Sequence, residues 1–170
     1  PPPDALVLPL RVGDVLDLYT KEHVGEMQEG REIKANMVML DTVAALLKNG
    51  PFHNGYLQKL SKFTGIGEVL RRDFKWVRQI ILVAGSHREL ASYKNSFEYI
   101  KRIKEGLEQM GFVVSLRLGH NPDSDLTFMI KSKILAWLVD GNWANLVRCV
   151  AQAAGSIVIG GDGIKPPPCN

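Results

Sequence analysis

The sequence has few cysteines and no long apolar run, two features that would each assign it to a known class of protein. Its 170 residues include only two cysteines, too few for a disulfide framework, and Cys149 falls in an apolar helical pattern that predicts a core position. No apolar run approaches the ~20 residues that a membrane-spanning helix needs, and no signal peptide is visible. We therefore expect no membrane segment in this chain.

An excess of charge of one sign is also missing. The net charge is +3, with basic and acidic residues interleaved, which is not typical of a nucleic-acid-binding protein. The apolar fraction of 45% is sufficient for a core, and the length predicts a single domain over residues 1–170. Because the chain does not begin with methionine, the possibility that it is a fragment stays open. The compartment stays open too, and we favour a soluble, cytoplasmic location.

Short apolar runs predict the architecture. Five of them have the length of buried strands: Ala5–Leu10, Gln79–Ala84, Phe112–Leu118, Ile134–Val139 and Ser156–Ile159. The later runs alternate with helical patterns at Glu89–Met110, after Asn121-Pro122, and at Asn142–Ala153. This alternation predicts an α/β fold, a three-layer Rossmann-like parallel sheet of about five strands. A mostly helical insert, about residues 15–76, follows the first strand and includes an amphipathic helix near residues 33–47.

The first strand ends in the sequence Arg11-Val12-Gly13-Asp14. Ligands of open α/β sheets bind at the carboxyl ends of the strands, and an arginine there can donate two charge-assisted hydrogen bonds to a phosphate. A glycine allows the chain to turn tightly at this point. The alternative is an ordinary strand end with one surface ion pair.

Polar residues follow the other strands as well. Gly141-Asn142 begins a helix directly after the fourth strand, and the free N–H groups and dipole of a helix amino terminus favour an anion. Ser86-His87 and His120 follow the second and third strands, so we expect all of them at the same edge as Arg11. Either histidine could contact a nucleotide or act as a general base. The alternatives are an ordinary βα turn and surface-loop histidines.

Asp123-Ser124-Asp125 permits a metal site, because two carboxylates on one short segment suit magnesium or manganese. However, Pro122 places both carboxylates in the first turn of a helix, where the helix dipole alone favours them. We expect this second role, and therefore binding that does not depend on a metal.

Three segments together resemble the fucosyltransferase-like glycosyltransferases. They are the Arg-x-Gly-Asp sequence at 11–14, the Asp-x-Asp-Leu-x-x-Met-x-x-Ser block at 123–132, and Gly-Asn-Trp-x-x-Leu-Val at 141–147. That family shares a His-x-Arg-x-Gly-Asp motif, and a late block in which an acidic residue, a Met and a Ser precede a strand and a turn rich in glycine and serine. Here Pro9 stands in place of the histidine, Val12 stands where a second arginine is frequent, and Asp140-Gly141-Asn142-Trp143 replaces the turn.

The resemblance implies a Rossmann-like domain that holds the nucleotide diphosphate of a donor sugar. Arg11 would contact the diphosphate, Gly13 would allow its close approach, and Asp14 would orient Arg11. Together with the residues at the strand ends, it leads us to expect donor binding by Arg11, Gly13, Ser86, His87, Asp125, Ser132, Gly141, Asn142 and Trp143. The candidate catalytic residues are Arg11, Asp14 and His120.

The function implied is a glycosyltransferase that moves a sugar from a nucleotide diphosphate sugar to the hydroxyl of a glycan or another acceptor. No cofactor is expected beside this substrate. Two alternatives stay open. One is a non-catalytic nucleic-acid-binding module, because Gly65-Ile66-Gly67 with the basic residues up to Lys75 resembles a helix-hairpin-helix motif, although nucleic acid is not the expected partner. The other is an α/β interaction domain without a small ligand.

Overall fold

The computed structural model describes residues 1–13, 16, 43–51, 56–85, 93–139, 141–161 and 166–169. Three of the predicted site residues, Asp14, Ser86 and His87, lie outside the described residues. So does most of the amphipathic helix predicted near residues 33–47.

Five parallel strands form one sheet in the order β3-β2-β1-β4-β5, which confirms the predicted α/β fold. Each strand begins and ends within two residues of its predicted bounds: β1 at Ala5–Arg11, β2 at Gln79–Gly85, β3 at Val113–Leu118, β4 at Ile134–Trp137 and β5 at Ile157–Gly160. The order places β1 in the centre, with β2 on one side and β4 on the other. The direction of winding therefore reverses between β1 and β4.

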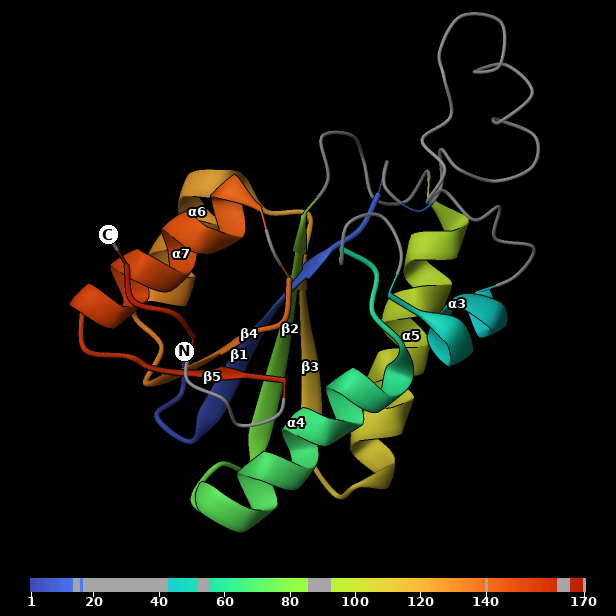
Figure 1. The fold of residues 1–170 in the computed structure, drawn as a ribbon, viewed down its shortest axis with the longest axis horizontal. Coiled ribbons are helices and arrows are strands. Elements are labelled where there is room, and N and C mark those ends of the chain that lie inside the picture. Colours follow the sequence, from blue (N-terminus) through green and yellow to red (C-terminus); the bar gives the residue numbers. More distant parts are fainter. Residues whose placement is uncertain are drawn as a thin grey trace, which may run out of the picture.

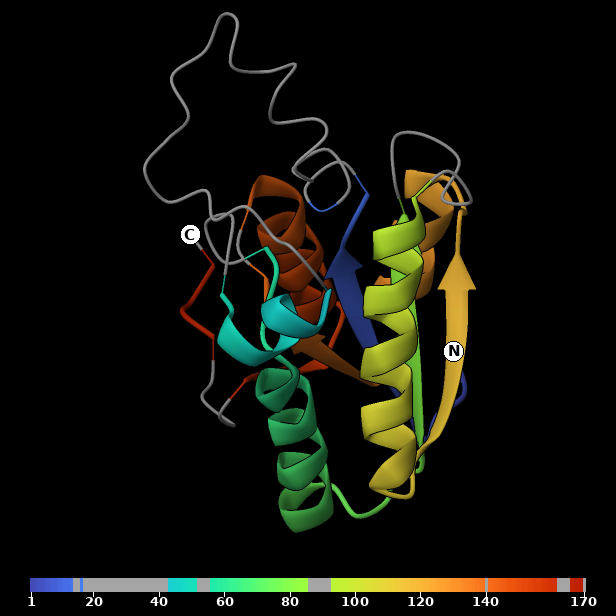
Figure 2. The ribbon, with the colours of Figure 1, turned by 90° about the vertical axis from the view of Figure 1, so that its right-hand side faces the viewer.

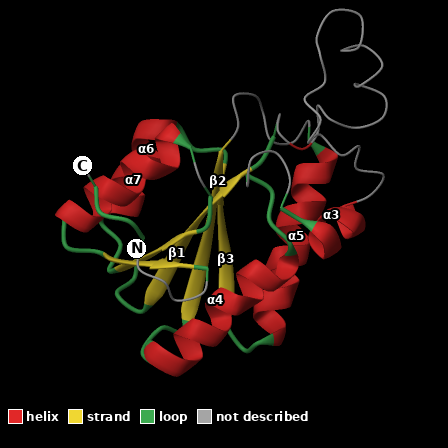
Figure 3. Cartoon of the chain, in the orientation of Figure 1, coloured by secondary structure: helices red, strands yellow, loops and turns green. Residues whose placement is uncertain are grey.

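Helices cover both faces of the sheet and complete the three layers (Figures 1 and 3). On one face lie α3 (Val43–Asn49), α4 (Leu60–Asp73) and α5 (Lys94–Gln109), and on the other lie α6 (Pro122–Ile130) and α7 (Asn142–Ala153). Successive residues of a strand point to opposite faces, so Leu6 and Leu8 join the first core cluster while Ala5 and Val7 join the second. No helix among the described residues is long and apolar enough to cross a membrane.

Local signals set the ends of the helices at the site. Asn121 caps α6, because its side-chain oxygen accepts a hydrogen bond from the Ser124 N–H at 2.8 Å, and Pro122 occupies the first helical position as predicted. Gly111, with φ of +92°, follows the end of α5 in the left-handed conformation that favours glycine. The helix α7 has the bounds that the sequence predicts.

Gly65-Ile66-Gly67 lies inside α4 and not in a hairpin between two helices. The helix runs without interruption from Leu60 to Asp73, and α4 lies beside α5 (Figure 2). A Cβ atom built on Gly67 would come within 2.6 Å of the Met110 sulfur, so this glycine allows the close packing of α4. The structural premise of the nucleic-acid-binding alternative is therefore wrong.

The sequence predicts a core position for Cys149. This prediction is wrong, because Cys149 forms a disulfide with Cys169. The residues 166–169 return along α7, where the Arg148 guanidinium donates a hydrogen bond to the Pro167 carbonyl oxygen. The buried Arg148 also stacks over the Trp137 ring at 4.9 Å from its centroid. The C-terminal segment is thus held on α7 by one covalent bond and one hydrogen bond.

We expect reduction of this disulfide to lower the free energy of unfolding by about 2–3 kcal/mol, because the bond closes a loop of moderate size. Thermal unfolding with and without a reductant measures the effect. The Cys169→Ser variant is the control: its melting temperature should match that of the reduced protein and should not respond to the reductant. A wild-type melting temperature that the reductant leaves unchanged would contradict this expectation.

Candidate functional site

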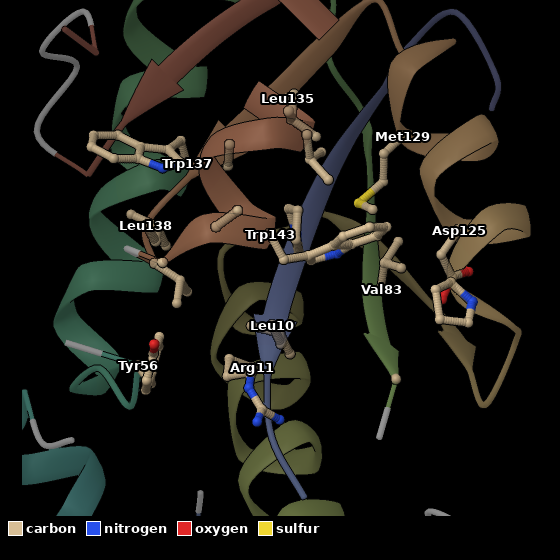
Figure 4. A pocket seen from close by; sticks show the side chains of 18 of the residues that line it. Leu10, Arg11, Tyr56, Val83, Asp125, Met129, Leu135, Trp137, Leu138 and Trp143 are labelled. Atoms are coloured by element: carbon tan, nitrogen blue, oxygen red, sulfur yellow. The ribbon is translucent and has the colours of Figure 1, made fainter. Parts of the chain in front are cut away.

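A cavity of about 360 Å³ lies at the carboxyl edge of the sheet. It lies where β1 and β4 separate, which is the place where open α/β sheets bind their ligands. Residues from the ends of β1, β2 and β4 and from the beginnings of α6 and α7 line it (Figure 4): Pro9, Leu10, Arg11, Tyr56, Val83, Gly85, His120, Pro122, Asp125, Met129, Leu135, Ala136, Trp137, Leu138, Val139, Gly141, Asn142, Trp143, Ala144 and Val147.

Arg11 is the last residue of β1, and its half-buried side chain lines this cavity. Its guanidinium donates a hydrogen bond from Nη1 to the Val12 carbonyl oxygen at 2.8 Å, and its Cζ lies 6.0 Å from the centroid of the Tyr56 ring. These contacts hold a delocalised, permanently charged group at the cavity.

The amino terminus of α7 lies at the same cavity. The first hydrogen bond of this helix joins the Asn145 N–H to the Gly141 carbonyl oxygen at 2.9 Å, so the N–H groups of Asn142, Trp143 and Ala144 precede it, and no side chain caps them. Gly141 has φ of +132°, and a Cβ atom built on it would come within 3.1 Å of the Tyr56 ring. A glycine is therefore required at this turn.

Tyr56 lies beside both predicted anion-binding features: its ring centroid is 6.0 Å from the Arg11 Cζ, and a Cβ atom built on Gly141 would come within 3.1 Å of the ring. The sequence indicated no role for it, because it belongs to the insert between β1 and β2. Tyr99 of α5 anchors this segment two residues further on: its buried hydroxyl donates to the Gln58 carbonyl oxygen and accepts from the Gln58 N–H, both at 3.0 Å. Burial raises the pKa of Tyr99 well above its ordinary value, so the phenol keeps the proton that it donates.

Asp125 also lines the cavity, with a buried carboxylate whose Oδ1 accepts a hydrogen bond from the Arg117 Nε at 2.8 Å. The Arg117 Nη2 donates to the Ser124 hydroxyl at 2.7 Å, and the guanidinium stacks over Phe128 at 4.5 Å from the ring centroid. This ion pair between β3 and α6 fixes the orientation of the carboxylate at the cavity.

Asp123 does not join Asp125, because residues two apart on a helix point in different directions: Asp123 is exposed whereas Asp125 is buried. Among the described residues, no group of three or more His, Cys, Asp or Glu side chains could hold a metal ion. The Asp-x-Asp sequence therefore brings no pair of carboxylates together.

The remaining predicted site residues lie in different surroundings. His120 is exposed at the rim of the cavity, directly after β3, as expected. Gly13 has φ of +83° and donates its N–H to the Ser96 hydroxyl at 2.8 Å, so this group serves the turn itself. Ser132 does not line the cavity. It is buried between α6 and β4, where its hydroxyl donates a hydrogen bond to the Met129 carbonyl oxygen at 2.6 Å.

No protein-family model matches the chain, and a search of curated proteins found no match. The fold and the side chains at the cavity are therefore what indicates a function for this chain.

We expect Tyr99→Phe to lower the free energy of unfolding by about 1–3 kcal/mol, because it removes both hydrogen bonds between the buried Tyr99 hydroxyl and the Gln58 backbone. Chemical denaturation measures this loss. Tyr93→Phe is the control, since Tyr93 is also buried but does not make the two hydrogen bonds to the Gln58 backbone. Equal stability of the two variants would contradict the anchoring role of Tyr99.

Proposed function

We propose that this chain is the donor-binding domain of a glycosyltransferase. It binds a nucleotide diphosphate sugar in the cavity at the carboxyl edge, and the sugar is transferred to an acceptor hydroxyl. One observation supports this proposal above all. Arg11 and the uncapped amino terminus of α7 line the same cavity, and Tyr56 lies beside both. Both features attract anions, and both lie at the reversal point of the sheet.

The chemistry follows from the charge that develops during transfer. When the bond between the sugar and the diphosphate breaks, negative charge accumulates on the leaving diphosphate. A guanidinium and a set of oriented N–H groups stabilise such a charge without needing to reorganise. His120, exposed at the rim, supplies a candidate general base for the acceptor hydroxyl.

The disulfide bears on where this reaction takes place. Disulfides persist in oxidising compartments and are rare in the cytoplasm. The pair formed by Cys149 and Cys169 therefore supports an oxidising compartment and counts against the cytoplasmic location favoured in the sequence analysis.

We expect Arg11→Ala to weaken the binding of nucleoside diphosphates about ten- to a hundredfold, because a charged hydrogen-bond pair contributes ~1.5–3 kcal/mol. Arg11→Lys should recover only part of this affinity, since the planar fork is lost. Isothermal titration calorimetry measures both. Arg72→Ala is the matched control, because the Arg72 guanidinium is exposed, pairs with its neighbour Asp73 and does not line the cavity. Equal affinities of wild type and Arg11→Ala would refute the assignment.

Donor binding should be unchanged by an excess of chelator, because Asp123 and Asp125 point in different directions. The same titration with and without chelator tests this expectation. Loss of binding on chelation, reversed by manganese, would show that a metal bridges the diphosphate.

A further inference from the structure

The cavity has two chemically different parts. One part is polar: Arg11 and the first N–H groups of α7 line the cavity, and so does the Asp125 carboxylate, which Arg117 neutralises. The other part consists of four buried apolar side chains that belong to the core beneath α6 and α7: Val83, Met129, Leu135 and Val147. A ligand that fills the whole cavity must therefore carry an anionic group at one end and a weakly hydrated body at the other.

Trp143 lies between these two parts. It is the second residue of α7, and its indole extends from the helix across the cavity toward Met129 and Val83 (Figure 4). It is 46% exposed, although the other core-facing residues of this helix, Val147 and Ala151, are buried. Exposure of this large ring costs free energy, because its apolar surface is not buried. The exposed indole therefore offers an apolar face to a ligand in the cavity.

The position of this ring restricts the ligand further. The backbone N–H of Trp143 is one of the uncapped groups at the start of α7, so one residue supplies both an anion donor and an aromatic face. A flat ring joined to a phosphate through a short linker would satisfy both, with the ring stacked on the indole and its polar edge toward the exposed rim at His120 and Asn142. A nucleoside diphosphate has this composition, whereas inorganic pyrophosphate lacks the ring.

We infer that Trp143 determines the specificity of the cavity by stacking on the base of a nucleoside diphosphate. The inference depends on the proposed function, since it names the part of the donor that this residue contacts. The phosphates are bound by Arg11 and the amino terminus of α7, and the base lies on the indole above Met129 and Val83. Trp143 thus selects donors with a base over ligands that carry only phosphate groups.

The test compares ADP, GDP, CDP, UDP and inorganic pyrophosphate as ligands, by calorimetry and by tryptophan fluorescence. Trp143→Ala should lower the affinity for nucleoside diphosphates about ten- to a hundredfold and leave the affinity for pyrophosphate unchanged, because only the stacking is lost. Trp143→Phe should retain affinity to within roughly threefold, since it keeps a flat ring. Trp76→Phe is the control, because Trp76 stacks under Lys133 and does not line the cavity.

The outcomes separate the two proposals. If the wild-type protein binds neither pyrophosphate nor any nucleoside diphosphate, the proposed function is wrong and the inference falls with it. If the wild type and Trp143→Ala bind nucleoside diphosphates equally well, the stacking role is overturned while diphosphate binding stands. The same follows if Trp143→Ala lowers the affinity for pyrophosphate as much as the affinity for nucleoside diphosphates. Quenching of tryptophan fluorescence by a nucleoside diphosphate that persists in Trp143→Phe and disappears in Trp76→Phe would also overturn the stacking role. A melting temperature for each variant shows that it is folded.

Discussion

β1 is buried on both faces and paired on both edges, and the place where it ends decides where the site lies. Its first four residues are fully buried, because the core clusters beneath the two helical layers meet at this strand. An interior strand of this kind cannot slip by one residue without turning its whole set of side chains to the wrong face. Arg11 is consequently held at the carboxyl edge by the packing of the residues before it.

A second layer of contacts holds the site from the side. Tyr99 of α5 hydrogen-bonds the backbone of Gln58, and this anchors the segment that carries Tyr56. The Tyr56 ring in turn lies close to Gly141, where a Cβ atom would come within 3.1 Å of it and where the φ of +132° favours glycine. On the other side of the cavity, the ion pair of Arg117 with Asp125 joins β3 to α6. The polar groups at the cavity are therefore positioned by buried partners.

The cavity combines polar and charged groups with apolar side chains, and this combination is a consequence of the fold. The carboxyl ends of parallel strands and the amino termini of the following helices meet at one edge, which concentrates N–H groups and charge there. Directly beneath them begins the core between the sheet and α6 and α7. An open position between β1 and β4 thus exposes both kinds of surface to a single ligand.

Local patterns in the sequence determined the strands, the main helices and the edge at which Arg11, His120 and Gly141 gather. These depend on residue spacing and on signals such as Asn121-Pro122 and Gly111, which act within one turn of chain. Ser132 shows the limit of this reasoning, because matching a family block says nothing about which end of a strand a residue reaches.

Only the tertiary structure decided which distant residues meet. It placed Tyr56 between Arg11 and Gly141, paired Cys149 with Cys169, and turned Asp123 away from Asp125. It also made Gly67 a contact between two helices where the sequence suggested a phosphate-binding hairpin. Each of these outcomes depends on side chains from separate elements packing together, and the periodicity of a single segment carries no information about its partner across the core.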